Sequence, residues 1–427
     1  MNTIQDIIQR INDGQLDERL LEIYQTKDRL SRERKRLISS IAEFSSLFPE
    51  DQEIEIYSAP GRSEIGGNHT DHQQGEVLAA SITDDAIAIA SRADAPRIRL
   101  LSKGYPMLTI SIEDLQKDAY PDGTTEALIA GVAAGMKDRG YSIGGFDAFV
   151  TSDVLSGSGL SSSAAFETLI GCILSGLYND MKLTDVENAM IGQYAENVFF
   201  GKPCGLMDQM ACSVGSLCHI DFRNPSDPVI ERIEFDLETA GYSLCITDTK
   251  GSHADLTDDY AAVPAEMKAV ASLFGKNVLI EVTEEEVLQQ ATRIRETCGD
   301  RAFLRAMHFY AENKRVQQEA AALKAKDMDG FLRLVRASGD SSYKYLQNVY
   351  TSHDLRHQNV AVALMLSEHL LGDNGVCRVH GGGFAGTIQA FVKKDAIEAY
   401  RTQMDAFFGE GSCSVLGIRK FGGIRIV

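Results

Sequence analysis

The sequence predicts an α+β fold of two domains, for three reasons. The chain has 427 residues, enough for two domains that each bury a core. Short segments with the alternating pattern of antiparallel strands occur in both halves, and long helical segments stand in blocks between them. This grouping favours α+β layering over a regular succession of βαβ units. We place the weakly marked boundary at residues 224–228, NPSDP, which predicts an N-terminal helical extension (1–45) and two domains (46–225 and 226–427).

Composition and charge restrict the possible functions. Hydrophobic residues make up 44% of the chain and charged residues 24%, as in soluble globular proteins. The 61 acidic and 42 basic residues leave a net charge of -19, which opposes binding to nucleic acid or to an anionic membrane surface. A small ligand with phosphate groups is compatible with this charge, because loop amides, helix N-termini and metal ions bind phosphate locally.

The cysteines and the N-terminus indicate a cytoplasmic protein. Eight cysteines are scattered without CxxC pairs, several of them in apolar runs such as GCILSGL, and we expect them to be reduced and mostly buried. The segment after Met1 lacks the apolar stretch of a signal peptide, and no run of about 18 apolar residues occurs. We therefore expect no membrane-spanning segment. The sequence leaves the oligomeric state open, with a monomer among the options.

The N-terminal extension is expected to be helical. Apolar residues recur at helical spacing at Ile4, Ile7, Ile8 and Ile11, and again from Leu20. The charge-rich segment RLSRERKRL is typical of a solvated helix face.

From Glu53 the pattern changes to period two. EIEIYSAPGR predicts a strand that ends at Pro60-Gly61, and EVLAASI and DAIAIASRA predict two more strands after the next loop. DAFVTSDVL, residues 147–155, predicts another strand, and SSSAAFETLIGCILSGLYND predicts the helix that follows it. Further along, SLCHIDF, SLCITDT, TIQAFV and GGIRIV are short strand candidates between long helical segments.

The segment SGSGLSSSAAFE, residues 156–167, is the strongest candidate for a ligand site. Gly157 and Gly159 let the backbone approach a ligand, and Ser161, Ser162 and Ser163 bring hydroxyls and amides to the start of the predicted helix. A serine-rich helix cap is the alternative, but three serines after two glycines favour a phosphate site. No GxxxxGK[ST] motif is present, so a P-loop is excluded.

A second glycine-rich segment, GGGFAG, begins at Gly381. It satisfies the GxGxxG pattern of dinucleotide-binding sites, but that pattern requires a helix after it, whereas TIQAFV predicts a strand. A Rossmann site is therefore excluded. Two interpretations are left, a wall of backbone beside a ligand and a plain tight turn.

The segment AENVFFGKPCGLMDQMACSVG, residues 195–215, contributes two carboxylates. Glu196 lies on a predicted helix and is a candidate ligand for Mg2+, which prefers carboxylate, hydroxyl and water oxygens. Asp208 follows the turn PCGLMDQ in an otherwise apolar segment. Taken alone, an aspartate after a turn is more often a helix cap, so the case for a catalytic Asp208 depends on the other motifs.

Four segments in one order carry a resemblance to a known family. GRSEIGGNHTDHQQG, SGSGLSSSAA, AENVFFGKPCGLMDQ and VHGGGFAGTIQAFV resemble segments of the GHMP small-molecule kinases, and most closely those of the galactokinase branch. The resemblance extends from about Phe44 to the C-terminus. It implies an N-terminal ATP-binding domain and a C-terminal domain with the active site in the cleft between them. It also implies an enzyme that transfers the γ-phosphate of ATP to the anomeric hydroxyl of galactose or of a galactose-configured sugar.

The resemblance further implies roles for single residues. Asp208 would be the catalytic carboxylate that faces the anomeric hydroxyl, and Arg62 would be the cation beside it. The sugar would contact Asn68, His69, Asp71 and Tyr260, and the turn of Gly381, Gly382 and Gly383 would close the site. The ATP phosphates would lie on Gly157, Ser158, Gly159, Leu160, Ser161, Ser162, Ser163 and Ala164, and Mg2+ would bind Ser162 or Ser163 together with Glu196.

Phosphoryl transfer suits these roles. Its transition state is loose, which leaves positioning and charge stabilisation to the protein. Asp208 would accept the sugar proton late, while Arg62 would lower the pKa of the aspartate and offset charge on the transferred group. An ionised aspartate is a weak base, so orientation of the hydroxyl is a second role that the sequence leaves open.

One position departs from the galactokinase pattern. Galactokinases usually read GEHTDYN, with a glutamate that accepts a hydrogen bond from the sugar near C6, whereas this chain has Asn68 there, followed by a DHQ ending. The exchange removes a charge-assisted hydrogen bond of about 1.5–3 kcal/mol, together with a charge that would repel an acidic sugar. Galacturonate or another C6-modified hexose is therefore an alternative substrate. A sugar-sensing regulator without turnover is a second alternative, which the intact Gly/Ser segment disfavours.

His380 is a second departure, because the family commonly has a small or hydroxylic residue there. We expect its side chain either to line the site or to pack inside the protein.

Overall fold

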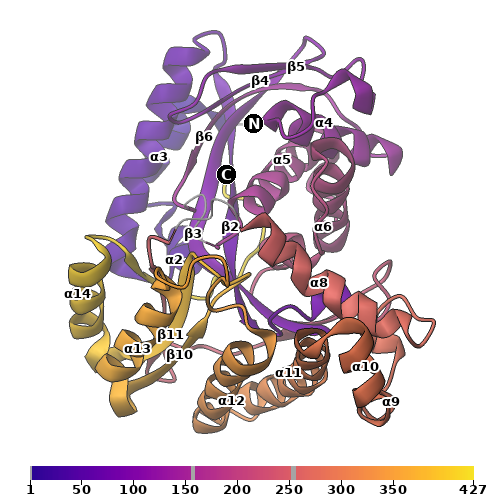
Figure 1. Cartoon of the computed structure of the whole chain (residues 1–427). Helices are drawn as coiled ribbons and strands as arrows, with labels where there is room; N and C mark the ends of the chain where they lie inside the picture. The colour runs from indigo at the N-terminus through magenta and orange to yellow at the C-terminus, as the bar shows by residue number, and fades with distance from the viewer. Residues whose placement is uncertain (1, 155–158, 252–255) are drawn as a thin grey trace.

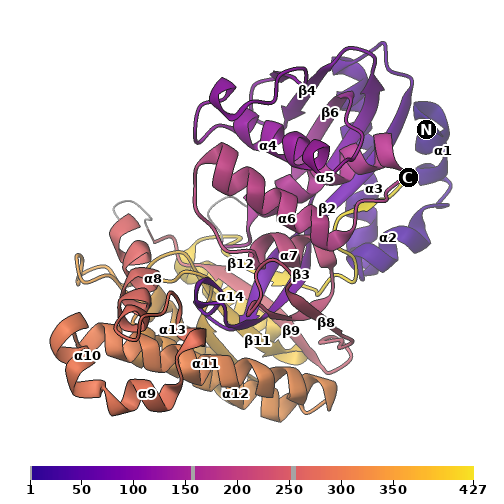
Figure 2. The same ribbon diagram turned by 90° about the vertical axis from the view of Figure 1, so that its right-hand side faces the viewer.

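The protein folds into two β-sheets with helices packed against them (Figure 1, Figure 2). In the computed structural model the described residues are 2–154, 159–251 and 256–427. The strands of the larger sheet are β1 (Asn2–Thr3), β2 (Glu53–Gly66), β3 (Glu76–Ala93), β4 (Arg97–Ser102), β5 (Leu108–Ser111), β6 (Gly145–Ser152), β7 (Leu217–Asp221), β8 (Val229–Ile233) and β13 (Ile424–Arg425). Their order is β1-β2-β3-β6-β4-β5, with β13 beside β2, and with β7 and then β8 continuing from β3.

Two strands of the larger sheet are longer than the sequence predicted. β2 does not end at Pro60-Gly61 but continues to Gly66, because shifts in its pairing with β3 bend the strand without ending it. The two strands predicted from EVLAASI and DAIAIASRA form one strand, β3, which pairs with β7 in its first part and with β6 in its last part. The polar segment that begins at Gly61 is therefore half strand and half turn, with a short 3-10 helix at Asp71–Gln73 in the turn.

Helices cover both faces of this sheet. Along one face lie α4 (Thr125–Asp138), α5 (Ser162–Asn179), α6 (Asp185–Tyr194) and α7 (Met207–Val214), and along the other lie α1 (Ile4–Asn12), α2 (Asp17–Tyr24) and α3 (Lys27–Leu47) (Figure 1, Figure 2). The alternation of β3 separates two cores: Ala88 packs with α4 and α5, whereas Ile87 and Ile89 pack with α1, α2 and α3. The helical prediction for residues 1–45 agrees with the structure, and the extension covers an apolar sheet face that would otherwise meet water.

A buried ionic network around Asp85 joins the extension to the sheet and to the end of the chain. Arg36 of α3 donates to Asp85 Oδ1 at 2.6 Å, and Arg419 donates to Asp85 Oδ2 at 3.0 Å. Tyr24 of α2 donates to the same carboxylate at 2.8 Å, as does the hydroxyl of Ser58. Burial alone would raise the pKa of Asp85, but Arg36 and Arg419 outweigh burial and hold the pKa below its ordinary value.

The second sheet is smaller and belongs, with helices α8–α14, to the C-terminal half of the chain. Its antiparallel strands are β9 (Tyr242–Asp248), β10 (Gly375–Val379), β11 (Thr387–Lys393) and β12 (Cys413–Leu416), in the order β10-β11-β9-β12. The helices of this half are α8 (Thr257–Ser272), α9 (Glu284–Gln289), α10 (Ala291–Cys298), α11 (Asp300–Lys324), α12 (Met328–Ser341), α13 (Asn359–Leu371) and α14 (Ile397–Phe408). β8 and β13 pair with the larger sheet although both lie beyond residue 225. The boundary predicted at residues 224–228 therefore does not divide the two sheets, because the chain returns to the first one at its end.

The cysteines agree with the prediction from sequence. All eight are free thiols, and six of them are buried. Within the described residues, no helix combines the length and the apolar character that a membrane crossing requires.

Candidate active site

Arg62 and Asp208 form a bidentate ion pair. Arg62 Nε lies 2.7 Å from Asp208 Oδ1, and Arg62 Nη2 lies 2.7 Å from Asp208 Oδ2. The guanidinium side chain is 8% exposed and belongs to β2, whereas the carboxylate is 33% exposed and stands in the first turn of α7. The arginine is thus held inside the protein, and the aspartate keeps an open side that can meet a ligand.

The pair keeps both groups charged. Burial alone would raise the pKa of Asp208, but the Arg62 guanidinium and the hydroxyl of Ser161 hold the pKa below its ordinary value. Burial likewise opposes the charge of Arg62, and Asp208 outweighs it and raises the arginine pKa. At neutral pH Asp208 is therefore an ionised, weakly basic carboxylate.

The Gly/Ser segment lies against this pair. Arg62 Nη1 donates to the carbonyl of Gly159, and the hydroxyl of Ser161 donates to Asp208 Oδ2. The backbone amide of Arg62 donates to the carbonyl of Leu160 at 3.0 Å, an approach that Gly61 permits, because a Cβ there would lie 2.9 Å from that oxygen. The start of α5 is therefore fixed next to the carboxylate.

The helix start provides amides and hydroxyls. Ser161 precedes α5 with a left-handed backbone (φ 57°), and Ser162 and Ser163, both partly exposed, form its first turn. The N-terminus of a helix with this geometry attracts anions. Leu160 and Ala164 are buried, so only their backbone could face a ligand. Gly157 and Ser158 lie outside the described residues.

Glu196 lies on a π-helical segment, Ala195–Phe200, between α6 and α7. Its Oε1 accepts from Lys202 Nζ at 3.0 Å, and its Oε2 accepts from Gln209 Nε2 at 2.8 Å. The described residues contain no cluster of three or more His, Cys, Asp or Glu that could hold a metal. A carboxylate that already binds an exposed ammonium, with serine hydroxyls at the start of α5, nevertheless fits a hard cation whose other ligands are water and phosphate oxygens.

Glu167 is a further carboxyl group beside Glu196, and the sequence analysis gave it no role. It is buried, and its Oε2 accepts from the same Gln209 amide at 3.1 Å, while its Oε1 has no hydrogen-bond partner among the described residues. Burial and the neighbouring Glu196 raise its pKa well above the ordinary value. Its sequence signal was its position four residues after Ser163, which places both on one face of α5.

Asp71 lies toward Asp208, in the turn between β2 and β3. Its carboxylate is packed against Gly205, where a Cβ would lie 2.2 Å from Asp71 Oδ2. Burial and the charge of Asp208 raise the pKa of Asp71 to about 6.

Asn68 is buried under the same turn, and its amide is fully used inside the protein. Its Nδ2 donates to Glu64 Oε1 at 3.1 Å and to the carbonyl of Gly381 at 2.7 Å, and its Oδ1 accepts from Asn348 at 2.8 Å. Glu64 in turn pairs with the buried Arg378 at 2.9 Å. A contact between Asn68 and a sugar would require the amide to exchange one of these partners.

His69 and Tyr260 are both bonded to the glycine turn. His69 Nε2 lies 3.1 Å from the carbonyl of Gly382, and burial lowers the pKa of this histidine. Tyr260 donates to the carbonyl of Gly383 at 2.9 Å, and its ring lies 2.7 Å from where a Cβ of Gly382 would be. The turn therefore needs glycine at position 382 for close approach, and it links the two halves of the molecule.

His380 precedes this turn and packs inside the protein. Its Nε2 lies 3.1 Å from Ser63 Oγ, and its Nδ1 lies 3.0 Å from Thr387 Oγ1. Burial and the neighbouring arginines Arg62 and Arg378 lower its pKa well below the ordinary value, so the ring is neutral. Of the two interpretations from sequence, the structure favours packing, although the ring also approaches the Gly/Ser segment, since a Cβ at Gly159 would lie 3.3 Å from Nδ1.

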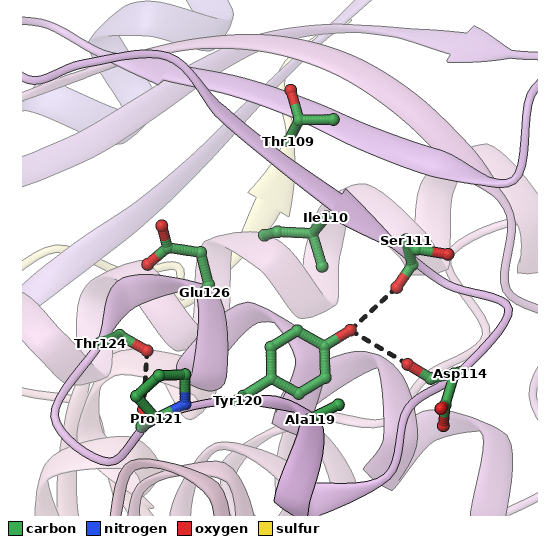
Figure 3. A pocket seen from close by; sticks show the side chains of 9 residues that line it. All are labelled: Thr109, Ile110, Ser111, Asp114, Ala119, Tyr120, Pro121, Thr124 and Glu126. Atoms are coloured by element: carbon green, nitrogen blue, oxygen red, sulfur yellow. Dashed lines mark hydrogen bonds between the residues drawn. The ribbon is translucent and has the colours of Figure 1, made fainter.

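A groove of about 420 Å³ opens where β5 meets the start of α4 (Figure 3). Tyr120 lines it and is anchored by hydrogen bonds from its hydroxyl to the carbonyls of Ser111 (2.9 Å) and Asp114 (3.1 Å). The other lining residues are Thr109, Ile110, Ala119, Pro121, Thr124 and Glu126. The groove adjoins the segment that carries Glu196, because the Tyr120 ring packs against Phe199 with 6.4 Å between centroids. No sequence pattern had pointed to it.

Known protein families match two parts of the chain. The family model described as "GHMP kinases N terminal domain" matches residues 127–216, and the one described as "Galactokinase galactose-binding signature" matches residues 42–92. Galactokinase from Glaesserella parasuis serovar 5 (strain SH0165) is 30% identical over 355 residues, which cover 80% of this chain and 86% of that protein. Galactokinase from Actinobacillus pleuropneumoniae is 31% identical over 357 residues, with the same shares covered.

Solved structures share the fold. Lactococcus lactis galactokinase complexed with galactose superposes with a TM-score of 0.76 at 24% identity, covering 90% of this chain and 98% of that one. A mevalonate kinase superposes with a TM-score of 0.59 at 14% identity, covering 87% of this chain and 98% of that one. The fold predicted from the sequence is confirmed.

Proposed function

The chain belongs to the galactokinase branch of the GHMP kinases, and we propose that it is an ATP-dependent kinase that phosphorylates the anomeric hydroxyl of galactose. The observation that carries this proposal is the bidentate pair of Arg62 with the half-open carboxylate of Asp208, directly beside the start of α5. An acceptor hydroxyl on Asp208 would then lie next to an anion-binding helix start, which is the arrangement that phosphoryl transfer needs.

In this proposal Asp208 orients the anomeric hydroxyl and takes its proton late in the reaction, because its lowered pKa makes it a weak base. Arg62 keeps the carboxylate ionised and offsets negative charge as the phosphoryl group moves. Both residues are held by contacts with Gly159 and Ser161, so little reorganisation is needed when the substrates bind.

The nucleotide phosphates are proposed to bind the amides of residues 159–164, with Gly157 and Ser158 continuing the same segment. Ser162 or Ser163 and Glu196 are proposed to hold Mg2+, which would neutralise negative charge on the nucleotide phosphates. Asp71, His69, Tyr260 and Asn68 are proposed to surround the sugar, with Asn68 supporting the loop through its bonds to Glu64 and Gly381.

A coupled assay of ADP release tests the function. We expect the highest kcat/KM with galactose when it is compared with galacturonate, N-acetylgalactosamine and arabinose, since the relatives named above are galactokinases. Phosphorus NMR of the product should locate the phosphate on C1. A preference for galacturonate would contradict the proposed sugar, and no ADP release with any of the four would contradict a kinase and favour a regulator.

The adenine base is proposed to enter the groove beside Tyr120. We expect Tyr120→Ala to raise the KM for ATP about tenfold, because loss of a base-stacking ring costs about 1–3 kcal/mol, while the KM for galactose changes less than about twofold. Tyr120→Phe is the matched control, since it keeps the ring and removes only the hydroxyl that anchors the loop. Equal increases in both KM values, or the same effect from the phenylalanine variant, would contradict this location.

Asp71 predicts a pH dependence for sugar binding. An ionised carboxylate accepts hydrogen bonds from sugar hydroxyls, and with a pKa of about 6 it loses this ability as the pH falls through that value. We expect the KM for galactose to rise roughly tenfold between about pH 7.5 and about pH 5. Asp71→Asn should raise KM at all pH values and flatten the profile. A variant that keeps the wild-type slope would assign the titration to another group.

A further inference from the structure

Lys202 places a positive charge among the carboxylates of the site. It lies on the loop of residues 201–206, between the π-helical segment that carries Glu196 and the helix that carries Asp208. Its Nζ is 3.0 Å from Glu196 Oε1, and the two side chains differ sharply in exposure, at 63% for the lysine and 5% for the glutamate. The carboxylate is therefore fixed, whereas the ammonium stands at the surface and is free to turn away.

Two buried carboxyl groups, those of Glu196 and Glu167, lie close together beside Lys202. Glu196 and Glu167 share the amide of Gln209, at 2.8 Å and 3.1 Å, and so lie close to each other. Burial alone would lower the pKa of Lys202, but Glu196 outweighs it and raises the pKa, so the lysine is charged. The same ammonium opposes the rise in the pKa of Glu167 and adds to the lowering of the pKa of Asp208, so its charge acts on these two carboxyl groups as well as on Glu196.

Lys202 contacts Glu196 Oε1, the oxygen that a metal bound to Glu196 would need. Gln209 donates to Glu196 Oε2, which leaves Oε1 as the oxygen paired with the exposed Lys202. An ammonium and a divalent cation cannot both bind one carboxylate oxygen at close range without repulsion. Once Lys202 has left Glu196, its ammonium is a flexible point charge that can bind phosphate oxygens.

We propose that Lys202 is an exchanging cation of the nucleotide site. In the unliganded protein it holds Glu196, and when a metal and a nucleotide bind it leaves that carboxylate and contacts the triphosphate. This inference rests on the proposed function, because it takes the ligand to be a nucleoside triphosphate with its metal.

The alternative is an ordinary surface ion pair. Exposed pairs contribute little, and such a lysine could be removed without consequence for ligand binding. The two accounts predict different effects of the lysine on metal affinity and on nucleotide affinity. An exchanging lysine competes with a metal in the absence of nucleotide and assists the nucleotide in its presence, whereas an ordinary surface pair does neither.

Lys202→Met separates these accounts without any turnover. We expect Mn2+, followed by electron paramagnetic resonance without nucleotide, to bind the variant about three- to tenfold more tightly than wild type, because its competitor is gone. We expect the non-hydrolysable complex Mg2+–AMPPNP, followed by calorimetry, to bind about tenfold more weakly, because one charge-assisted contact is lost. Lys202→Arg keeps the charge and should retain most of the nucleotide affinity.

Lys314→Met is the matched control, since Lys314 of α11 is 65% exposed and paired with Glu284 of α9, in the half of the molecule that contains the smaller sheet. It should leave both affinities at wild-type values. If Lys202→Met changes both affinities less than about twofold, or weakens both together, the proposal is overturned. Failure of the proposed function has a different signature, namely no ADP release by wild type, which these binding measurements do not use.

Discussion

Asp208→Asn is expected to lower kcat by about 10²–10⁴-fold while the KM for galactose changes less than about threefold. The amide keeps the size of the side chain and one oxygen for Arg62, so the sugar pocket keeps its shape. It removes the negative charge and the site that takes the proton. The loss should therefore appear in the chemical step and not in sugar binding.

Steady-state ADP release across galactose concentrations measures both parameters. AMPPNP binding by calorimetry and thermal unfolding serve as checks that the nucleotide site and the fold persist. Equal losses in kcat and in apparent sugar affinity would count against Asp208 as the group that faces the reacting hydroxyl.

Asp85→Asn is expected to lower the free energy of unfolding by about 3–5 kcal/mol, the usual cost of breaking a buried ion pair from one side. Arg419 is fully buried, and its salt bridge is to Asp85 at 3.0 Å, so the variant leaves a buried guanidinium without its counter-charge. Arg36 and Tyr24 lose the same carboxylate, which loosens the N-terminal helices from the sheet.

Asp84→Asn is the matched control for Asp85. Asp84 is the neighbouring carboxylate, paired with Arg29 at 2.8 Å at a partly exposed site, and its loss should cost less than about 1 kcal/mol. Urea unfolding followed by circular dichroism measures both variants, since the chain has no tryptophan. Similar values for the two variants would refute a central role for the Asp85 network.

The Asp85 network also predicts a direction with pH. The folded state lowers the pKa of Asp85, so its contribution is present above the unfolded pKa and is lost as the pH falls through the folded pKa. The stability difference between wild type and Asp85→Asn should therefore shrink below about pH 4.

Much of the local structure could be predicted because its causes are local. Ile4, Ile7 and Ile11 recur at helical spacing, and these positions belong to α1. The Gly/Ser segment precedes a helix, and α5 begins at Ser162. The predicted ends of two strands were wrong. Pro60 and Gly61 usually mark a turn, but pairing with β3 continues β2 beyond them. The two strands predicted after the next loop form the single strand β3, because it pairs with β7 in its first part and with β6 in its last part.

The candidate site was only partly predictable. The order of four motifs identified Arg62, Asp208 and Glu196, and the family resemblance placed Arg62 beside Asp208, but the contacts of Glu196 with Lys202 and Gln209 came only from the structure. Lys202 and Glu167 lie inside two of the motif segments, but the sequence analysis assigned neither of them a role, and their closeness to Glu196 became evident only from the amide of Gln209 and the ion pair with Lys202. Asn68 was expected to meet the sugar, and its buried bonds to Glu64 and Gly381 could not be inferred from the residues beside it.

By itself, the sequence determined the family, the helical character of the extension and the residue types of the site. These depend on periodicity, turn chemistry and motif order, which are properties of neighbours along the chain. Only the tertiary structure decided the bidentate geometry of the Arg62–Asp208 pair and the pairing of Asp85 with Arg419, which lies 334 positions away. Such pairs form because packing brings distant segments together and burial makes an unpaired charge costly, and neither condition leaves a mark on the local sequence.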